Sequence, residues 1–493
     1  MIIKAIIFLI IILNVIPVWG ATRLVTTGGG ASGDCTSTPC SPQYAINQAQ
    51  AGDTVSFADG TYSMTTDLVT VRSGGTFSTP SWPSYPTNPS TTAIDGACSS
   101  VISIKSANKW GAILNAANEV GITVEHNCIE VDGLKMTGTP SGYGFIVLGN
   151  SNTIQGVRIK NIYIDNESIA VDRYVTRAND VSYSYIKDCY FYRTWYAVFT
   201  NTGSLAHHFI YEGNEVNGAN MDIFRPFGHD ILYKDNIIHE VTDTQELHCD
   251  FIQSFGNSNN FAYNIIFDGN LMYNGLGATV AIGQVSREEI NTDDIRDWTF
   301  RNNVFANIRG IWGGDALRQK WYNNTFYRVP DPSGSITDPI RLGCSGGTSG
   351  DSWCANDSEI KNNLFVACAS NSDASGWYNI NGGGTVTGLS ADYNMVTNDD
   401  NTAKSGFTGV ETHGVSGGNP QFVSKTDPYN FMIGSTSGAK DKGVTIATFS
   451  LDKLGNTRSG TWDIGAYEYT DGGGSETGNI NPGITIPGGV TIR

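Results

Sequence analysis

The fold is decided by YKDNII (233–238) and four close copies of it: FDGNLM (267–272), FRNNVF (300–305), WYNNTF (321–326) and IKNNLF (360–365). Each copy has strand-forming residues on both sides of an amide. Looser copies extend the pattern in both directions: VDGLKM (131–136), IKNIYI (159–164), KDCYF (187–191), YEGNEV (211–216) and ADYNMV (391–396). Neighbouring copies are about 21 to 39 residues apart, a spacing typical of solenoids and propellers.

The central residues of these copies give the repeat a physical meaning. They are Gly133, Asn161, Cys189, Asn214, Asn236, Asn270, Asn303, Asn324, Asn363 and Asn394. Gly and Asn tolerate a left-handed backbone, so each copy predicts a sharp corner between two short strands. Stacked coils would place the amides in one column, each hydrogen-bonded to the next. The pattern therefore predicts an all-β parallel solenoid, with coils over residues 101–435.

The first twenty residues and the net charge indicate in which compartment the protein acts and which partners it can bind. Residues 1–20 contain one Lys, an apolar run and small residues at the end, as in a secretory signal peptide. The run is too short to span a membrane comfortably. A net charge of −17 argues against nucleic acid as a partner. We therefore expect a secreted, extracellular monomer with no membrane span in the mature chain.

Nine cysteines in an exported chain predict some disulfides and at least one free thiol. Cys35 and Cys40 are close in sequence and flanked by Gly, Ser and Pro, and so are Cys344 and Cys354. We predict these two disulfides. Cysteines within or beside the repeat strands are interpreted as buried apolar thiols: Cys128, Cys189 and Cys249.

The strands that follow the corners should share one sheet. They lie at 143–149, 196–201, 221–228, 249–256, 278–284, 309–315 and 338–344. Long connections at 239–248 and 327–338 interrupt the otherwise regular spacing. Because long loops on a regular scaffold often carry binding and catalysis, we predict the functional site on the face spanning 221–256.

Two neighbouring strands on this face share a pattern, M-D-I-F-R and C-D-F-I-Q, which makes Asp222 equivalent to Asp250 and Arg225 equivalent to Gln253. Adjacent strands are about 4.8 Å apart. Carboxylates so close together share a proton or hold a cation such as Ca²⁺. Asp222 and Asp250 are therefore candidate catalytic residues and a candidate Ca²⁺ site. The alternative is a structural polar pair at a corner.

Strict alternation along these strands would send Arg225 into the core, where burial of its charge is costly. A bulge or corner near Phe224 or Ile252 would bring both sets of polar side chains to the surface. The other candidate catalytic residues are His248, Arg225 and His229, and the candidate substrate-binding residues are Gln253, Asp243, Glu246 and Trp312. A His or Arg near carboxylates suits proton abstraction α to a uronate carboxylate, whereas two carboxylates suit a glycosidase.

Two end segments resemble a known group of proteins. PQYAINQAQAGDTVSFADGTY (42–62) resembles the start of many secreted right-handed parallel β-helix proteins, and WDIGAYEY (462–469) matches the D-x-G-A-Y/F-E phrase that ends many of them. The chain from about residue 40 to 470 resembles the pectate-lyase-like superfamily. This resemblance implies a right-handed parallel β-helix with an N-terminal capping helix and extracellular work on polysaccharides. The W-x-D-H and R-x-P-x-x-R phrases of the main pectate lyases are absent, so no catalytic residue is transferred.

The remaining segments complete the predicted organisation. Residues 21–100 form the cap and a Ser/Thr/Pro-rich excursion, 436–470 the closing segment, and 471–493 a Gly/Pro-rich tail. We expect an exported protein that cleaves an acidic, uronate-containing polysaccharide by β-elimination or hydrolysis. The alternative is a non-catalytic glycan-binding, adhesion or matrix protein.

Overall fold

The computed structural model describes most of the chain. The described residues are 20–116, 121–138, 144–166, 176–194, 199–201, 206–219, 222–241, 250–256, 261–275, 280–287, 295–308, 311–314, 316–329, 339–346, 352–368, 378–381, 386–403, 411–427, 429–471, 484–486 and 490–492. The predicted signal peptide falls almost wholly outside them.

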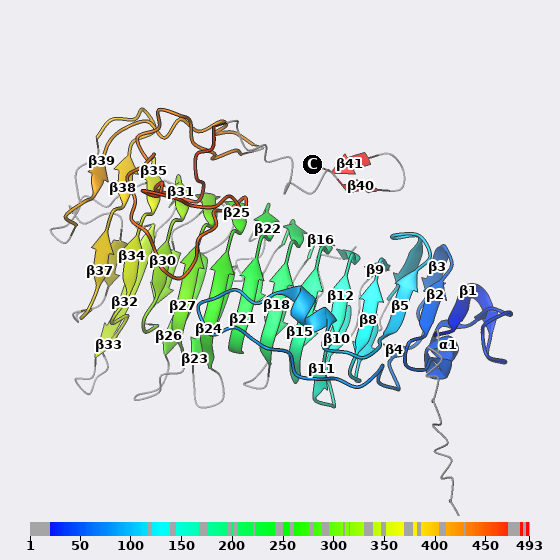
Figure 1. Cartoon of the computed structure of the whole chain (residues 1–493). Coiled ribbons are helices and arrows are strands. Elements are labelled where there is room, and N and C mark those ends of the chain that lie inside the picture. Colours follow the sequence, from blue (N-terminus) through cyan, green and yellow to red (C-terminus); the bar gives the residue numbers. More distant parts are fainter. Residues whose placement is uncertain are drawn as a thin grey trace, which may run out of the picture.

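Three long sheets run side by side along the molecule, and the chain passes from one to the next in each coil (Figure 1). Their strands pair in parallel, apart from the antiparallel pairing of β32 (Ile340–Gly346) with β33 (Ser352–Cys354). The strands from β1 to β39 therefore stack coil on coil, and the predicted parallel β-helix is confirmed.

Sheet A has fourteen strands: β1 (Thr22–Gly30), β2 (Thr54–Phe57), β5 (Ile102–Ser106), β8 (Ile129–Asp132), β11 (Ile154–Gln155), β12 (Arg158–Lys160), β15 (Val181–Lys187), β18 (His207–Glu212), β21 (Gly228–Lys234), β24 (Ala262–Asp268), β27 (Ile295–Arg301), β30 (Lys320–Tyr322), β34 (Glu359–Lys361) and β37 (Ser390–Asp392). Sheet B has thirteen: β3 (Gly60–Ser63), β6 (Ala112–Asn115), β9 (Lys135–Gly138), β13 (Tyr163–Asn166), β16 (Tyr190–Tyr192), β19 (Glu215–Asn217), β22 (Ile237–His239), β25 (Leu271–Gly275), β28 (Val304–Ile308), β31 (Thr325–Tyr327), β35 (Leu364–Val366), β38 (Met395–Thr397) and β39 (Val415–Ser416). Sheet C consists of β4 (Leu68–Val69), β7 (Ile122–Val124), β10 (Ile146–Leu148), β14 (Thr176–Ala178), β17 (Phe199–Asn201), β20 (Phe224–Arg225), β23 (Asp250–Gly256), β26 (Val280–Arg287), β29 (Ile311–Gly314), β32, β33 and β36 (Tyr378–Asn381). A separate hairpin, β40 (Ile484–Ile486) with β41 (Val490–Ile492), lies near the C-terminus.

The repeated asparagines form the predicted column at the corner between sheets A and B. Asn303 shows the pattern: its Nδ2 donates to Asn324 Oδ1 at 3.0 Å and to the Phe267 carbonyl at 2.9 Å. Its Oδ1 accepts from both the backbone N–H and the Nδ2 of Asn270, each at 2.9 Å. The same bonds join every neighbouring pair from Asn214 to Asn394. These amides are buried, so the column satisfies the polar groups of each corner.

The left-handed residue of each corner is one position earlier than the sequence analysis placed it. Asp235, Asn302, Asn323 and Asn362 have φ between 52° and 59°, and each directly precedes a ladder asparagine. Gly133 and Asn161 belong to this left-handed row and are not ladder residues. The corner thus has two requirements in sequence: a residue that accepts positive φ, then an inward-pointing amide.

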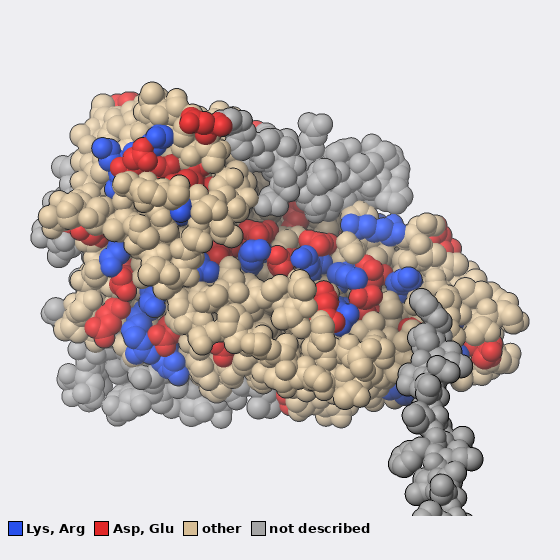
Figure 2. Space-filling model, viewed as in Figure 1, with Lys and Arg blue, Asp and Glu red and all other residues tan. Residues whose placement is uncertain are grey.

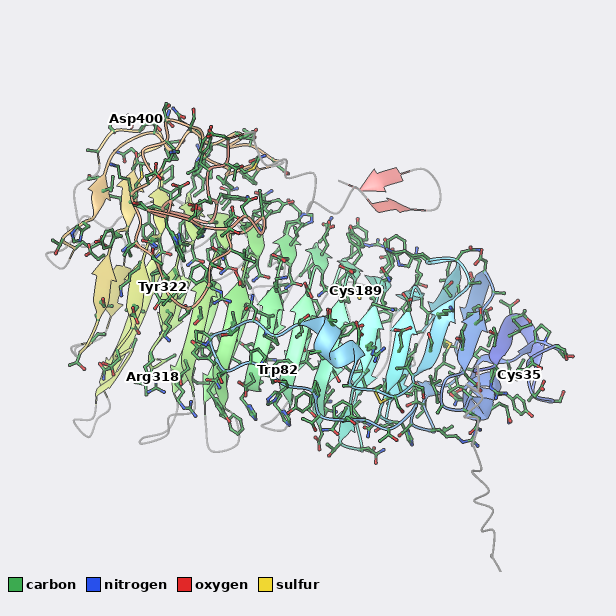
Figure 3. The ribbon with its side chains drawn as sticks, in the orientation of Figure 1. Cys35, Trp82, Cys189, Arg318, Tyr322 and Asp400 are labelled. Atoms are coloured by element: carbon green, nitrogen blue, oxygen red, sulfur yellow. A yellow bond between two sulfur atoms is a disulfide. The ribbon has the colours of Figure 1, made fainter. Side chains whose placement is uncertain are left out.

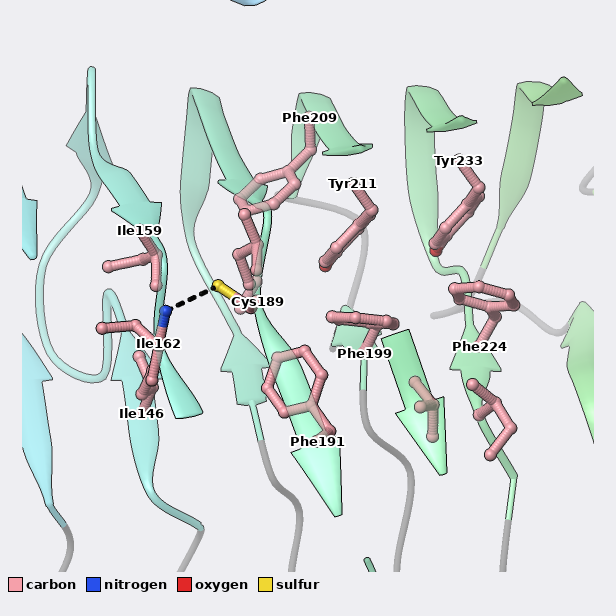
Figure 4. Close-up of a cluster of buried hydrophobic side chains, with 14 of the residues drawn as sticks. Ile146, Ile159, Ile162, Cys189, Phe191, Phe199, Phe209, Tyr211, Phe224 and Tyr233 are labelled. Carbon is pink, nitrogen blue, oxygen red and sulfur yellow. Dashed lines mark hydrogen bonds between the residues drawn. The ribbon is translucent and has the colours of Figure 1, made fainter. Parts of the chain in front are cut away.

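Aromatic rings stack in register inside the solenoid. Tyr211, Tyr233, Phe267, Phe300 and Trp321 form a continuous stack with ring centroids 4.0 to 5.0 Å apart. Figure 4 shows the start of this core, with Phe199 and Phe224 entering from sheet C. Because each coil buries its rings only against its neighbours, the length of the chain does not enlarge the core's cross-section.

The cysteines divide between disulfides and buried thiols. The predicted Cys35–Cys40 disulfide is present. The prediction of a free thiol at Cys128 was wrong. Cys128 forms a disulfide with Cys98, because the excursion before Cys98 returns to the coil that carries Cys128. Cys189 is a buried thiol, as predicted: it accepts a hydrogen bond from the backbone of Ile162 (Figure 4), and burial raises its pKa to about 12.

The remaining cysteine predictions are only partly within the described residues. Cys344 on β32 and Cys354 on β33 lie opposite one another in the antiparallel pairing, which suits the predicted bridge, although their side chains are outside the description. Cys249 also lies outside the described residues.

Segments outside the coils lie against two of the sheets. Helix α1 (Pro42–Gln48) sits at the N-terminal end of the solenoid, as expected for a cap. Residues 74–97, which include helix α2 (Thr91–Asp95), cross sheet A and are called the strap. The closing segment packs on sheet B, where Ile464 and Tyr467 join one apolar cluster with Val304, Leu364 and the preceding Phe431.

The strap is tied to sheet A by polar contacts. Tyr85 Oη lies 2.6 Å from Thr299 Oγ1, and Arg301 donates to the Pro86 carbonyl at 2.9 Å. Arg301 also pairs with Asp268 at 2.9 Å, while Asn88 donates to the same carboxylate at 2.7 Å. Charged side chains of both signs are interspersed along the surface of the neighbouring strands (Figure 2). Arg301 is thus one of the residues that join the strap to the solenoid.

Replacing Arg301 with alanine is expected to lower the free energy of unfolding by about 3–5 kcal/mol, because it leaves the Asp268 carboxylate buried without its cation. Burial by itself would raise the pKa of Asp268, but Arg301, Asn302 and Asn88 outweigh it and hold the pKa below 3.8. A lowered folded-state pKa stabilises the protein above the unfolded value and loses that contribution as the pH falls below it. The difference in urea unfolding between wild type and variant should therefore be largest at neutral pH and shrink as the pH falls through the lowered pKa of Asp268.

The matched control for this prediction is Arg328→Ala. Arg328 pairs with Asp399 at 2.9 Å, but its side chain is 51% exposed. An exposed pair contributes roughly 0–1 kcal/mol. Equal losses in the two variants would contradict the anchoring role of Arg301.

Candidate functional site

The strands predicted to carry the site do share one sheet. The seven predicted segments correspond to β10, β17, β20, β23, β26, β29 and β32, all in sheet C. The sequence analysis missed β14, which lies between β10 and β17. No strand was predicted for sheet C between Asn161 and the next copy of the repeat. That gap in an otherwise regular series indicated a missing strand, which is β14.

Asp222 and Asp250 lie on adjacent coils, as predicted, but both are buried. Asp222 is 2% exposed and Asp250 is 0% exposed. Oδ1 of Asp222 accepts a hydrogen bond from the backbone N–H of Asp250 at 3.0 Å. Oδ2 of Asp222 lies 3.5 Å from Arg225 Nε, and Oδ2 of Asp250 accepts from Gln253 Nε2 at 3.2 Å. Each carboxylate therefore contacts the polar side chain three residues later on its own strand.

Two consecutive core residues on each chain segment resolve the conflict between the carboxylates and strict alternation. Ile223 and Phe224 both point into the core, and so do Phe251 and Ile252. Two consecutive core residues break the alternation at the point where the sequence required it. The acid before each pair and the Arg or Gln after it consequently lie on the same side of the chain.

The described residues do not fit a Ca²⁺ site at this pair. Ca²⁺ takes about six to eight oxygen ligands. Here the guanidinium of Arg225 already lies beside the Asp222 carboxylate, and a second cation there would be repelled. Asp222 instead contacts Arg225, and Asp250 contacts Gln253.

A row of polar side chains crosses sheet C at the level of Arg225. Arg177 on β14 lies opposite Thr200, which lies opposite Arg225. Phe224 is opposite Ile252, so Gln253 follows Arg225 in the row. Neighbouring positions are about 4.8 Å apart along the solenoid. Arg177, Arg225 and Gln253 are partly exposed, which gives this face a cationic, hydrogen-bonding line across successive coils.

The other predicted site residues are not all brought to this row. His229 lies on β21 in sheet A, because the chain turns out of sheet C at Pro226 and Phe227. Its ring contacts Asp230 and stacks on His207 and Tyr263 instead. Trp312 lies on β29 in register with Arg341, with its side chain outside the description. His248, Asp243 and Glu246 are outside the described residues.

Neither α1 nor α2 has the length and apolar character needed to cross a membrane, and no other helix occurs among the described residues. This finding concerns the described part of the chain alone.

Comparison with known proteins finds similar folds among solved structures but no match in sequence. No family model matches the chain, and no curated protein matches it in sequence. Among solved structures, the A-module of an Azotobacter vinelandii mannuronan C-5 epimerase is 13% identical, with a TM-score of 0.50; the match covers 79% of this chain and 98% of that one. A pectate lyase is 14% identical over 91% of this chain and 96% of its own, with a TM-score of 0.48.

At such identities the likeness concerns the backbone. The stacked parallel sheets, the ladder at the corner and the likeness to the epimerase module agree on the predicted parallel β-helix fold. The chain has the parallel β-helix fold that the epimerase module also has.

Proposed function

We propose that this protein is exported and cleaves a uronate-containing polysaccharide along the outward face of sheet C, by β-elimination. The observation that carries the proposal is the row formed by Arg177, Arg225 and Gln253 across four neighbouring coils, with Thr200 between the two arginines. A polymer with a carboxylate on its sugars would meet a guanidinium at intervals along this line. Bidentate pairing of Arg with carboxylates gives such a contact both charge and direction.

The burial of the two acids favours elimination over hydrolysis. A glycosidase needs two carboxylates in contact with the sugar, one acid and one base or nucleophile. Asp222 and Asp250 are buried and engaged with Arg225, Gln253 and the backbone. In this proposal they hold the surface groups in position and do not touch the substrate.

Arg225 would take part in the chemistry through charge. Removal of the proton α to a uronate carboxylate places negative charge on that carboxylate, and a guanidinium fixed beside it stabilises the charge as it develops. His248, two residues before the start of β23, is proposed as the base that removes the proton. The leaving sugar oxygen departs from the adjacent carbon and leaves an unsaturated end.

Export is proposed from residues 1–20 together with the cysteine chemistry. Cys35–Cys40 and Cys98–Cys128 are disulfides, which persist in oxidising compartments outside the cytosol. Their presence supports a protein that acts outside the cell.

The proposal is tested by incubating the purified protein with pectate, alginate and a neutral glucan, each with and without added Ca²⁺. Ultraviolet absorbance of unsaturated ends and a reducing-end assay are recorded together. We expect equal yields of both signals from an acidic polymer and none from the neutral one. Reducing ends without absorbance would instead indicate hydrolysis. Binding without either product would favour the alternative function, a non-catalytic glycan-binding protein.

A further inference from the structure

A second polar cluster lies on sheet A, away from the row on sheet C. It contains His207 and His208 on β18 and His229 and Asp230 on β21. One ligand-capable atom from each of His208, His229 and Asp230 lies within 4.8 Å of the others. Sequence analysis could not combine these residues, because they come from separate coils.

A repeated backbone kink produces the cluster. His208 and Asp230 have φ of 54° and 55°, and the strand register passes from His207 to Phe209 opposite His229 to Ile231. The kink breaks the alternation of the strands, so two consecutive side chains of each strand lie outside the core. Two strands thus bring four candidate ligands together where a regular pair would bring two.

The surroundings hold the rings in place. Trp82 of the strap packs edge-on against His208, with ring centroids 4.9 Å apart, and lies over these strands in Figure 3. His229 is stacked between His207 and Tyr263, at 4.9 and 4.8 Å. The cluster remains open to small ions, since the side chains of His229 and Asp230 are 21% and 17% exposed.

The carboxylate of Asp230 is oriented by Asn264 from outside the cluster and by His229 within it. Asn264 Nδ2 donates to Asp230 Oδ1 at 3.0 Å, and His229 Nδ1 lies 2.6 Å from Asp230 Oδ2. Hydrogen bonds of this kind around histidines and carboxylates are usual in metal sites, where they fix the ligands.

We propose that His208, His229 and Asp230 bind a divalent transition-metal ion of the zinc class. Two imidazoles and one carboxylate form a donor set suited to Zn²⁺, with a fourth position left for water. His207 lies beside this set, with its Nδ1 2.6 Å from the Nδ1 of His208. Ca²⁺ is a poor fit, because it requires oxygen ligands throughout. The site would tie the strap-covered part of β18 to β21 and stands apart from the proposed polysaccharide face.

The test uses the full protein, freed of metal with a chelator. Zn²⁺ is titrated by calorimetry, and Co²⁺ is added separately to record its ligand-field absorbance. We expect one saturable Zn²⁺ equivalent, a raised melting temperature with Zn²⁺, and a Co²⁺ spectrum typical of nitrogen and oxygen ligands. His229→Ala and Asp230→Asn should each weaken Zn²⁺ binding at least about tenfold, and so should Asn264→Ala, through the loss of its hydrogen bond.

The control is His413→Ala. His413 Nδ1 lies 2.8 Å from Asp392 Oδ2, but its side chain is 53% exposed and it belongs to another part of the solenoid. Zn²⁺ affinity should not change in this variant. Folding of every variant is checked by circular dichroism without metal, and Asn264→Ala serves where a ligand variant unfolds. Absence of saturable Zn²⁺ binding by the wild type, equal affinity in the ligand variants, or equal displacement by Ca²⁺ would overturn the proposal.

Discussion

Asn303→Ala is expected to lower the free energy of unfolding by roughly 4 kcal/mol or more, because it breaks several buried hydrogen bonds at once. The substitution removes bonds to four groups at once: the Phe267 carbonyl, Asn324 Oδ1, and the backbone N–H and Nδ2 of Asn270. Asn303 is 0% exposed, so water cannot replace the lost partners. A buried polar group left unsatisfied costs about 1–3 kcal/mol.

Two further variants sharpen this test, with urea unfolding followed by circular dichroism. Asn303→Asp keeps the shape and the acceptor but loses the donor and buries a charge, so it should not restore stability. Asn217→Ala is the control, because the amide of Asn217 donates to Tyr190 Oη at 3.3 Å near the surface, and its loss should cost about 1 kcal/mol or less. A small effect of Asn303→Ala would mean that the column is not what holds the coils in register.

Arg225→Ala should reduce polysaccharide cleavage by about 10²–10³-fold in kcat, the loss typical when one charge-stabilising donor is removed. This prediction rests on the proposed function. Arg225→Lys should recover only part of the rate, because an ammonium lacks the planar fork that pairs with a carboxylate. The measurement is the initial rate of unsaturated-end formation on the polymer that the wild type cleaves.

The loss of cleavage in this variant must be distinguished from a loss of folded structure. Truncating Arg225 removes the cation beside the buried Asp222, so Arg225→Ala is combined with Asp222→Asn to remove the unpaired charge as well. Arg193→Ala is the matched control, because Arg193 pairs with Asp165 at 2.6 Å and its side chain is 40% exposed, next to sheet B. Full activity in the folded double variant would remove Arg225 from the reaction.

The ladder shows why so much of the fold could be predicted. An inward amide at each corner must bond to its neighbour, so Asn recurs at every coil from Asn214 to Asn394. In the coil before Asn214, Cys189 holds the equivalent position. That requirement is local and is repeated in the sequence. The preceding left-handed position accepts Gly, Asn or Asp, and its overlap in composition with the ladder explains why Gly133 and Asn161 were assigned to the wrong row.

The candidate site was only half predictable. Asp222, Arg225, Asp250 and Gln253 repeat one pattern at equivalent positions, so their neighbourhood followed from the spacing. The burial of Asp222 and Asp250 did not follow from the spacing, because it depends on two consecutive core residues in each segment. His229 was misplaced for a related reason: four residues after Arg225 the chain has already entered another sheet.

By itself, the sequence determined the architecture: parallel coils, an amide column, and which strands share sheet C. These follow from constraints that act within one coil and recur in the next. Only the tertiary structure decided which side chains from different coils contact one another at the surface. The pairing of Cys98 with Cys128, the strap held by Arg301 and the cluster of His208, His229 and Asp230 all depend on three-dimensional contacts between segments with no shared pattern. Such contacts leave no period in the chain, and a period was the signal that the sequence offered.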